Sequence, residues 1–111
     1  CACACACVAC ACACSDVTLK ENVLPISGAL SMVEQMRGVF FDWNDQANLY
    51  GKQPGNREVG VIANEMQKVL PEVVFNYKDV KSVDYGAING VLIEAIKELK
   101  QEIDGLKTKD R

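Results

Sequence analysis

The residues that could carry out chemistry in this 111-residue chain are limited by the complete absence of histidine. Without an imidazole, a Ser-His-Asp triad, a Cys-His dyad and any zinc site that needs histidine are excluded. A hydrolytic serine would have to take its base from a lysine, a carboxylate or a tyrosine. Ser15 and Lys20 are one such pair, five residues apart, but exposed serines and lysines at this spacing are common. The spacing by itself predicts no activity.

All seven cysteines lie within residues 1–14, which read CACACACVACACAC. Their spacing is C-x-C except for a single C-x-x-C between Cys7 and Cys10, so the two C-x-x-C pairs of zinc sites are not present. We interpret residues 1–14 as a low-complexity segment, either the end of a preceding region or an artefact, with a metal-binding or redox appendage as the weaker alternative. Residues 15–111 contain no cysteine and suit a reducing cytoplasm.

Charge and hydropathy exclude two classes of partner. The net charge is −3, the pI is near 4.9, and the 12 basic residues are scattered along the chain. No basic stripe of the kind that binds nucleic acid is present. The longest uncharged runs in residues 15–111 are far shorter than the roughly 18 apolar residues of a membrane span. We therefore expect one domain over residues 15–111, with no nucleic acid, membrane, metal or cofactor as a partner.

The first half of this domain reads as a short helix followed by a β-hairpin. Ser27 fits the N-cap of the helix, and Gly38 fits the C′ position after its end. Residues 39–43 alternate in polarity as a half-buried strand does. The polar loop 44–57 contains Gly and Pro and would lead into a strand over residues 58–62. The inward side chains of the first strand would be Val39, Phe41 and Trp43.

The second half begins with a helix over residues 63–70, which Pro71 would end. A second hairpin follows, with strands over residues 73–76 and 80–84 and a turn over residues 77–79. The inward side chains of the helix would be Ile62, Met66, Val69 and Leu70.

The last predicted element is a helix over residues 86–106. It carries an apolar seam of five residues with spacings of 4, 3, 4 and 3, namely Leu92, Ile96, Leu99, Ile103 and Leu106. This pattern is typical of a coiled coil. An amphipathic helix that packs on its own domain is the alternative, because two heptads are short. The residues that supply charge around the seam are Glu94, Lys97, Glu98, Lys100, Glu102 and Asp104.

Six segments in unbroken order carry a resemblance to a known family. They are SDVTLKEN from Ser15, RGVFFDW from Arg37, GVIANE from Gly60, LPEVV from Leu70, VDY from Val83 and LIEAIKEL from Leu92. Together they resemble the chaperone of endosialidase domain, also called the S74 peptidase or intramolecular chaperone auto-processing domain. That family occurs at the C-terminal end of phage tail spikes and fibres.

The resemblance implies an α+β fold with two short helices, short strands and a long C-terminal helix that forms a trimeric coiled coil. It implies a homotrimer that folds the preceding fibre segment of the same chain in the host cytoplasm during virion assembly. The domain then cuts itself off, with Ser15 and Lys20 as the catalytic pair. The expected cut adjoins Ser15, and we place it between Ser15 and Asp16. Residues 1–14 would be the end of the fibre region.

The resemblance also limits the supporting groups. Some members carry a glutamate directly before the lysine, where this chain has Leu19. Any helper role of that glutamate would therefore pass to Glu21. Asn22 is a candidate hydrogen-bond donor to the oxyanion. A free lysine amine has a pKa of about 10.4, so a lysine base must be desolvated or placed beside a cation. We therefore expect cutting to wait for trimer assembly. The alternative is a structural trimerisation domain that is never cut.

Overall fold

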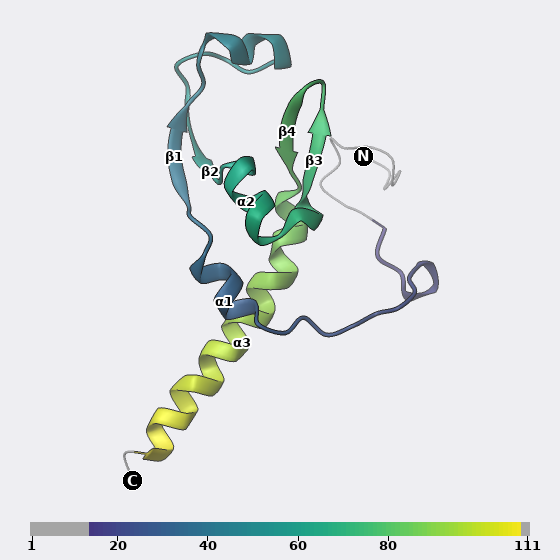
Figure 1. Ribbon diagram of the computed structural model, residues 1–111, viewed down its shortest axis with the longest axis vertical. Helices are drawn as coiled ribbons and strands as arrows, with labels where there is room; N and C mark the ends of the chain where they lie inside the picture. Colours follow the sequence, from purple (N-terminus) through teal and green to yellow (C-terminus); the bar gives the residue numbers. More distant parts are fainter. Residues whose placement is uncertain (1–13, 110–111) are drawn as a thin grey trace.

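The computed structural model describes residues 14–109, which form two β-hairpins, three short 3₁₀ turns, two short helices and one long C-terminal helix (Figure 1). The predicted mixed α+β class is confirmed. The Cys/Ala segment was interpreted over residues 1–14, of which residues 1–13 lie outside the described residues.

The first hairpin pairs β1 (Val39–Asp42) with β2 (Arg57–Gly60) in antiparallel register. The predicted alternation is confirmed, because the side chains along β1 are half-buried and exposed in turn. Phe41 packs edge-to-face on Trp43, with ring centroids 4.9 Å apart. The loop between the strands contains the 3₁₀ turn η2 (Asp45–Tyr50), which the sequence pattern did not predict.

The second hairpin pairs β3 (Val74–Tyr77) with β4 (Val80–Val83). The two residues of its turn, Lys78 and Asp79, have φ of 45° and 66°. Two positive φ values at the centre of a two-residue turn match the right-handed twist of the strands. The turn prediction over residues 77–79 was therefore one residue too long.

The first helix, α1, spans Ala29–Glu34 and is shorter than the sequence predicted. Ser27 is not its N-cap; Gly28 occupies that position with φ of 70°, in the left-handed region that favours glycine. Gly38 is not at the C′ position, because the helix already ends at Glu34. The prediction failed because the cap comes from another element: the Glu98 carboxylate accepts the backbone N–H of Ala29.

The second helix, α2, spans Ala63–Val69 and leads into the 3₁₀ turn η3 (Pro71–Val73). It packs against the second hairpin and η3, and its Met66 side chain is only 1% exposed. The described residues form two small core clusters. The buried members of the clusters are Ala29, Met66, Val73, Ile88, Val91 and Ala95.

The long helix α3 spans Tyr85–Lys109 and extends well beyond the other elements (Figure 1). One face, with Ile88, Val91 and Ala95, packs on α1 and on η3. The predicted seam lies on the adjacent face, and all five of its side chains are 38–67% exposed. None of the described helices is both long and apolar enough to span a membrane.

Candidate functional site

Ser15 and Lys20 lie in direct contact at the start of the described chain. The Lys20 Nζ donates a hydrogen bond to the Ser15 Oγ over 2.5 Å, although the two residues are five positions apart. Both residues are exposed. A hydroxyl beside an amine is the geometry that a serine nucleophile and its lysine base require.

A single 3₁₀ turn, η1 (Val17–Leu19), separates the two residues. The Leu19 N–H bonds to the Asp16 carbonyl and the Lys20 N–H bonds to the Val17 carbonyl, at 3.0 and 3.2 Å. Lys20 then returns to an extended conformation. The turn thus reverses the chain between the serine and the lysine, which brings their side chains together.

The Asp16 carboxylate is bonded within the turn and not to the lysine. It accepts the Thr18 backbone N–H at 2.9 Å and the Thr18 hydroxyl at 2.7 Å. These bonds hold the pKa of Asp16 below its ordinary value, and the bond from the Thr18 hydroxyl contributes most. Asp16 therefore leaves the lysine amine to the serine hydroxyl.

The two supporting candidates lie beyond the pair. Within residues 14–109, the side chains of Glu21 and Asn22 form no hydrogen bond to Ser15 or Lys20. Asn22 has φ of 53°, a left-handed conformation that asparagine adopts more readily than most residues. In this geometry Asn22 bends the chain just after the lysine.

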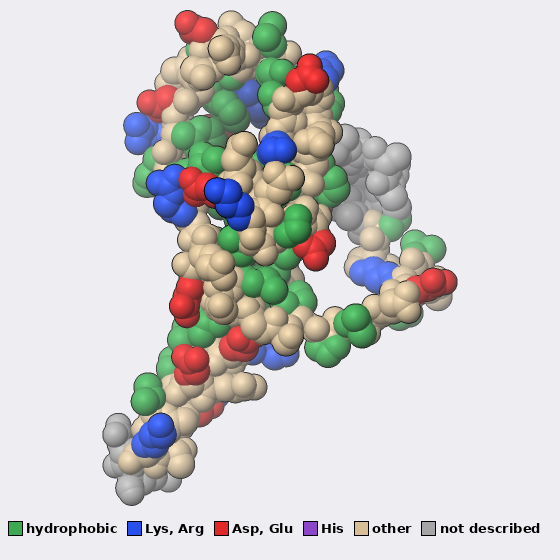
Figure 2. Space-filling view, viewed as in Figure 1, with side chains coloured by type: hydrophobic (Ala, Val, Ile, Leu, Met, Phe, Trp, Pro, Cys, Tyr) green, Lys and Arg blue, Asp and Glu red, His purple; other side chains and the backbone are tan. Residues whose placement is uncertain are grey.

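The pair is carried by an exposed arm, residues 14–28, which stands away from the hairpins and joins the body at α1 (Figure 1). Hydrophobic side chains are visible on the arm and on the hairpins (Figure 2). The large hydrophobic residues exposed on the arm are Val17, Leu19, Val23, Leu24 and Ile26. An arm of this composition is expected to gain stability when another surface covers it.

The root of the arm is fixed to α3. The Glu98 carboxylate accepts the N–H of Ala29 at 2.8 Å and that of Leu30 at 3.3 Å, which satisfies two free donors at the start of α1. Because α1 begins where the arm ends, this contact sets where the arm leaves the body. Glu98, predicted as one of several charges around the seam, is half-buried and has this more specific structural role.

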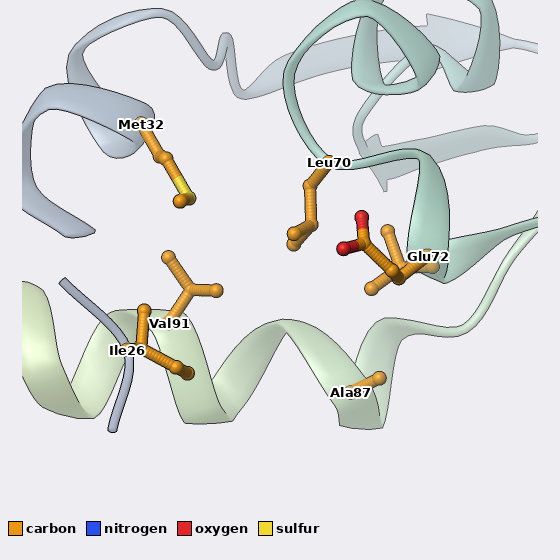
Figure 3. A pocket seen from close by; sticks show the side chains of 7 residues that line it. Ile26, Met32, Leu70, Glu72, Ala87 and Val91 are labelled. Atoms are coloured by element: carbon orange, nitrogen blue, oxygen red, sulfur yellow. The ribbon is translucent and has the colours of Figure 1, made fainter. Parts of the chain in front are cut away.

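An apolar cavity lies beside the root of the arm, between α1, η3 and α3 (Figure 3). The side chains of Ile26, Met32 and Val91 face it, and Glu72 is its only charged lining residue. The cavity contains neither Ser15 nor Lys20. Its lining contains no serine, threonine, cysteine or lysine, so we do not assign the chemistry to it.

The sequence comparisons identify the family of the chain. The family described as chaperone of endosialidase matches residues 15–75, which is more than half of the chain and begins at the serine. The chain belongs to the chaperone of endosialidase family, and the resemblance noted from its motifs is confirmed.

The curated relatives are phage fibre proteins. The chain is 36% identical over 100 residues to the long tail fiber protein Gp37 of Enterobacteria phage K3 and to that of Enterobacteria phage T2. It is 34% identical over 99 residues to the protein of the same name from Enterobacteria phage Ox2. These alignments cover 85–86% of the chain, but only 8% of the K3 protein, 7% of the T2 protein and 39% of the Ox2 protein.

Sequence reasoning missed two residues around the site. Thr18 was not singled out, although an Asp-x-Thr spacing is a known signal for a side chain that caps its own turn. The cap that Glu98 places on α1 had no local signal, because the bonded residues are 69 positions apart in the chain.

Proposed function

We propose that this domain is an intramolecular chaperone that assembles a phage tail fibre as a trimer and then releases itself by cutting beside Ser15. The observation that carries the proposal is the 2.5 Å contact between the Ser15 hydroxyl and the Lys20 amine, at the point where the family match begins. The tail fiber relatives support the fibre as the partner, namely the preceding segment of the same chain.

The proposed chemistry is an acyl transfer. A neutral Lys20 amine takes the proton of the Ser15 hydroxyl as its Oγ forms a bond to the carbonyl carbon of the scissile peptide. The protonated amine then gives that proton to the leaving nitrogen as the C–N bond breaks. Water hydrolyses the resulting ester and regenerates the hydroxyl. Each chain is cut once, because only the peptide bond beside its Ser15 is cleaved.

Covalent geometry favours one of the two bonds beside Ser15. To attack its own carbonyl, the Ser15 Oγ would have to close a strained four-membered ring. The carbonyl of Cys14 is reached through a five-membered ring, so a cut within one chain is easier between Cys14 and Ser15. A cut between Ser15 and Asp16, as expected from the resemblance, would suit attack by the serine of another copy. The mass of the released fragment distinguishes the two.

Trimerisation is supported by what the chain leaves exposed. Among the described residues, six hydrophobic side chains are buried and 18 large ones are exposed. Five of the exposed side chains form the α3 seam, whose heptad spacing suits a coiled coil. Contact with other copies would also remove water from the arm. Desolvation favours the neutral amine, so the same step that assembles the fibre would prepare the lysine as a base.

A time course of the full chain, with a reporter protein fused ahead of residue 1, tests the peptidase. We expect the wild type to separate into two products, and both Ser15→Ala and Lys20→Ala to stay intact while forming the same oligomer. Mass spectrometry gives the products, and light scattering gives the oligomer. A wild-type chain that is fully trimeric and uncut would refute the peptidase and leave the alternative, a permanent trimerisation domain.

The seam is tested by an isoleucine pair on α3. Ile96 belongs to the seam and is 67% exposed, whereas Ile93 is 57% exposed and lies outside the seam. Because neither side chain is buried in the single chain, a charge at either costs the fold itself little. We expect Ile96→Glu to yield monomers and Ile93→Glu to remain trimeric in light scattering. Equal behaviour of the two variants would contradict the seam assignment.

A further inference from the structure

The contact between Ser15 and Lys20 depends on the turn between them. A fully extended chain of five residues spans about 17 Å, which exceeds the combined reach of a serine and a lysine side chain. The observed contact is 2.5 Å, and η1 is the element that closes this gap. Whatever holds η1 folded therefore holds the pair together.

Little else in the described chain supports η1. Its two backbone hydrogen bonds are exposed, and none of its residues is buried. A single helical turn in water is marginal, because few hydrogen bonds offset the entropy of ordering its residues. The remaining support comes from the Asp16 carboxylate, which accepts both the N–H and the hydroxyl of Thr18.

We propose that Asp16 and Thr18 are positioning residues for self-cleavage: their paired hydrogen bonds hold η1 folded and thereby keep the Ser15 hydroxyl against the Lys20 amine. The inference rests on the proposed peptidase function and extends it to a residue, Thr18, that touches neither reacting atom. A carboxylate with two donors in the turn also stays away from the lysine, where it would favour the charged amine and oppose its role as base.

The expected effect follows from the strength of such caps. Removal of an N-cap acceptor lowers the ratio of folded to unfolded turn by roughly 2- to 30-fold. Loss of the hydroxyl bond alone corresponds to a drop of roughly 2- to 10-fold. Because only the folded turn brings the pair together, the rate of cleavage falls with the folded fraction of the turn, by at most the same factor.

The test is the cleavage rate of the full reporter-fused chain, followed in cell-free synthesis. Thr18→Val keeps the shape of the side chain but removes the hydroxyl, and we expect slower cleavage. Thr18→Ser restores a hydroxyl and should restore the rate to within about 2-fold of the wild type. Thr108→Val is the matched control, because its hydroxyl bonds to Asp104 at the far end of α3 and its loss should leave the rate unchanged.

A double-mutant cycle separates positioning from a requirement for aspartate near the cut. Asp16→Ala and Thr18→Val remove the same interaction, so we expect the double variant to cleave no more slowly than Asp16→Ala alone. Light scattering should give the wild-type oligomer for every variant, because Asp16 and Thr18 lie outside the α3 seam that is proposed to hold the copies together.

The outcomes are distinguishable. A wild-type chain that cleaves, with Thr18→Val cleaving equally fast, overturns the positioning role and leaves the peptidase intact. A rate lost in Thr18→Val but not restored in Thr18→Ser overturns it as well. A wild-type chain that forms trimers and does not cleave at all overturns the peptidase and this inference together.

Discussion

Replacing Glu98 with alanine should destabilise the domain more than its position on an exposed helix suggests. The carboxylate accepts two backbone N–H groups at the start of α1, at 2.8 and 3.3 Å, and Gly28 has no side chain to replace it. Ala29 is fully buried, so water cannot satisfy its N–H once the carboxylate is gone. Loss of a cap costs about 0.5–2 kcal/mol, and an unsatisfied buried donor about 1–3 kcal/mol. We expect about 2 kcal/mol for Glu98→Ala.

Urea unfolding of the full chain, followed by circular dichroism and by Trp43 fluorescence, measures this loss. Protein concentrations must match, because oligomer formation adds to apparent stability. Glu98→Gln keeps one acceptor oxygen and should fall between the wild type and Glu98→Ala. The control is Glu102→Ala, one turn further along α3, which should change stability by less than about 0.5 kcal/mol. If Glu98→Ala and Glu102→Ala were equally stable, the capping argument would be wrong.

Two further predictions concern contacts between distant segments. A Cβ at Gly60 would overlap the Tyr85 hydroxyl and lie 3.1 Å from the ring carbon Cζ of Tyr85. Gly60→Ala should therefore lower the free energy of unfolding in urea by about 1–2 kcal/mol. The double variant with Tyr85→Phe should lose less than the sum of the two single losses. The control Gly105→Ala, which meets open space on a helix, should stabilise by about 0.5–1 kcal/mol. The hydrogen bonds and charge of Arg37 lower the pKa of Glu65. The stabilisation from this ion pair is therefore fully present above the ordinary glutamate pKa, and it is lost as the pH falls through the lowered pKa. An NMR titration should place the Glu65 midpoint below that of an ordinary glutamate, and Arg37→Gln should raise it; an unchanged midpoint would contradict the pairing.

Local patterns in the sequence predicted most of the elements. The alternation along residues 39–43 and the turn predicted over residues 77–79 are local features, and both hairpins were expected from them. The spacing of apolar residues predicted α3, because an amphipathic helix repeats its pattern over many residues. The ends of α1 were predicted wrongly, since its cap comes from a helix far along the chain.

The candidate site, too, was predicted only in part from the sequence. The absence of histidine alone excluded the common hydrolytic triads, and the family motifs pointed to Ser15 and Lys20. Only the three-dimensional structure placed their side chains 2.5 Å apart, turned Asp16 toward Thr18 and tied the arm to Glu98. Residue types and their periodicity are properties of the sequence and can be recognised without a structure. A contact between particular atoms depends on how backbone turns and distant elements bring them together, and folding decides that.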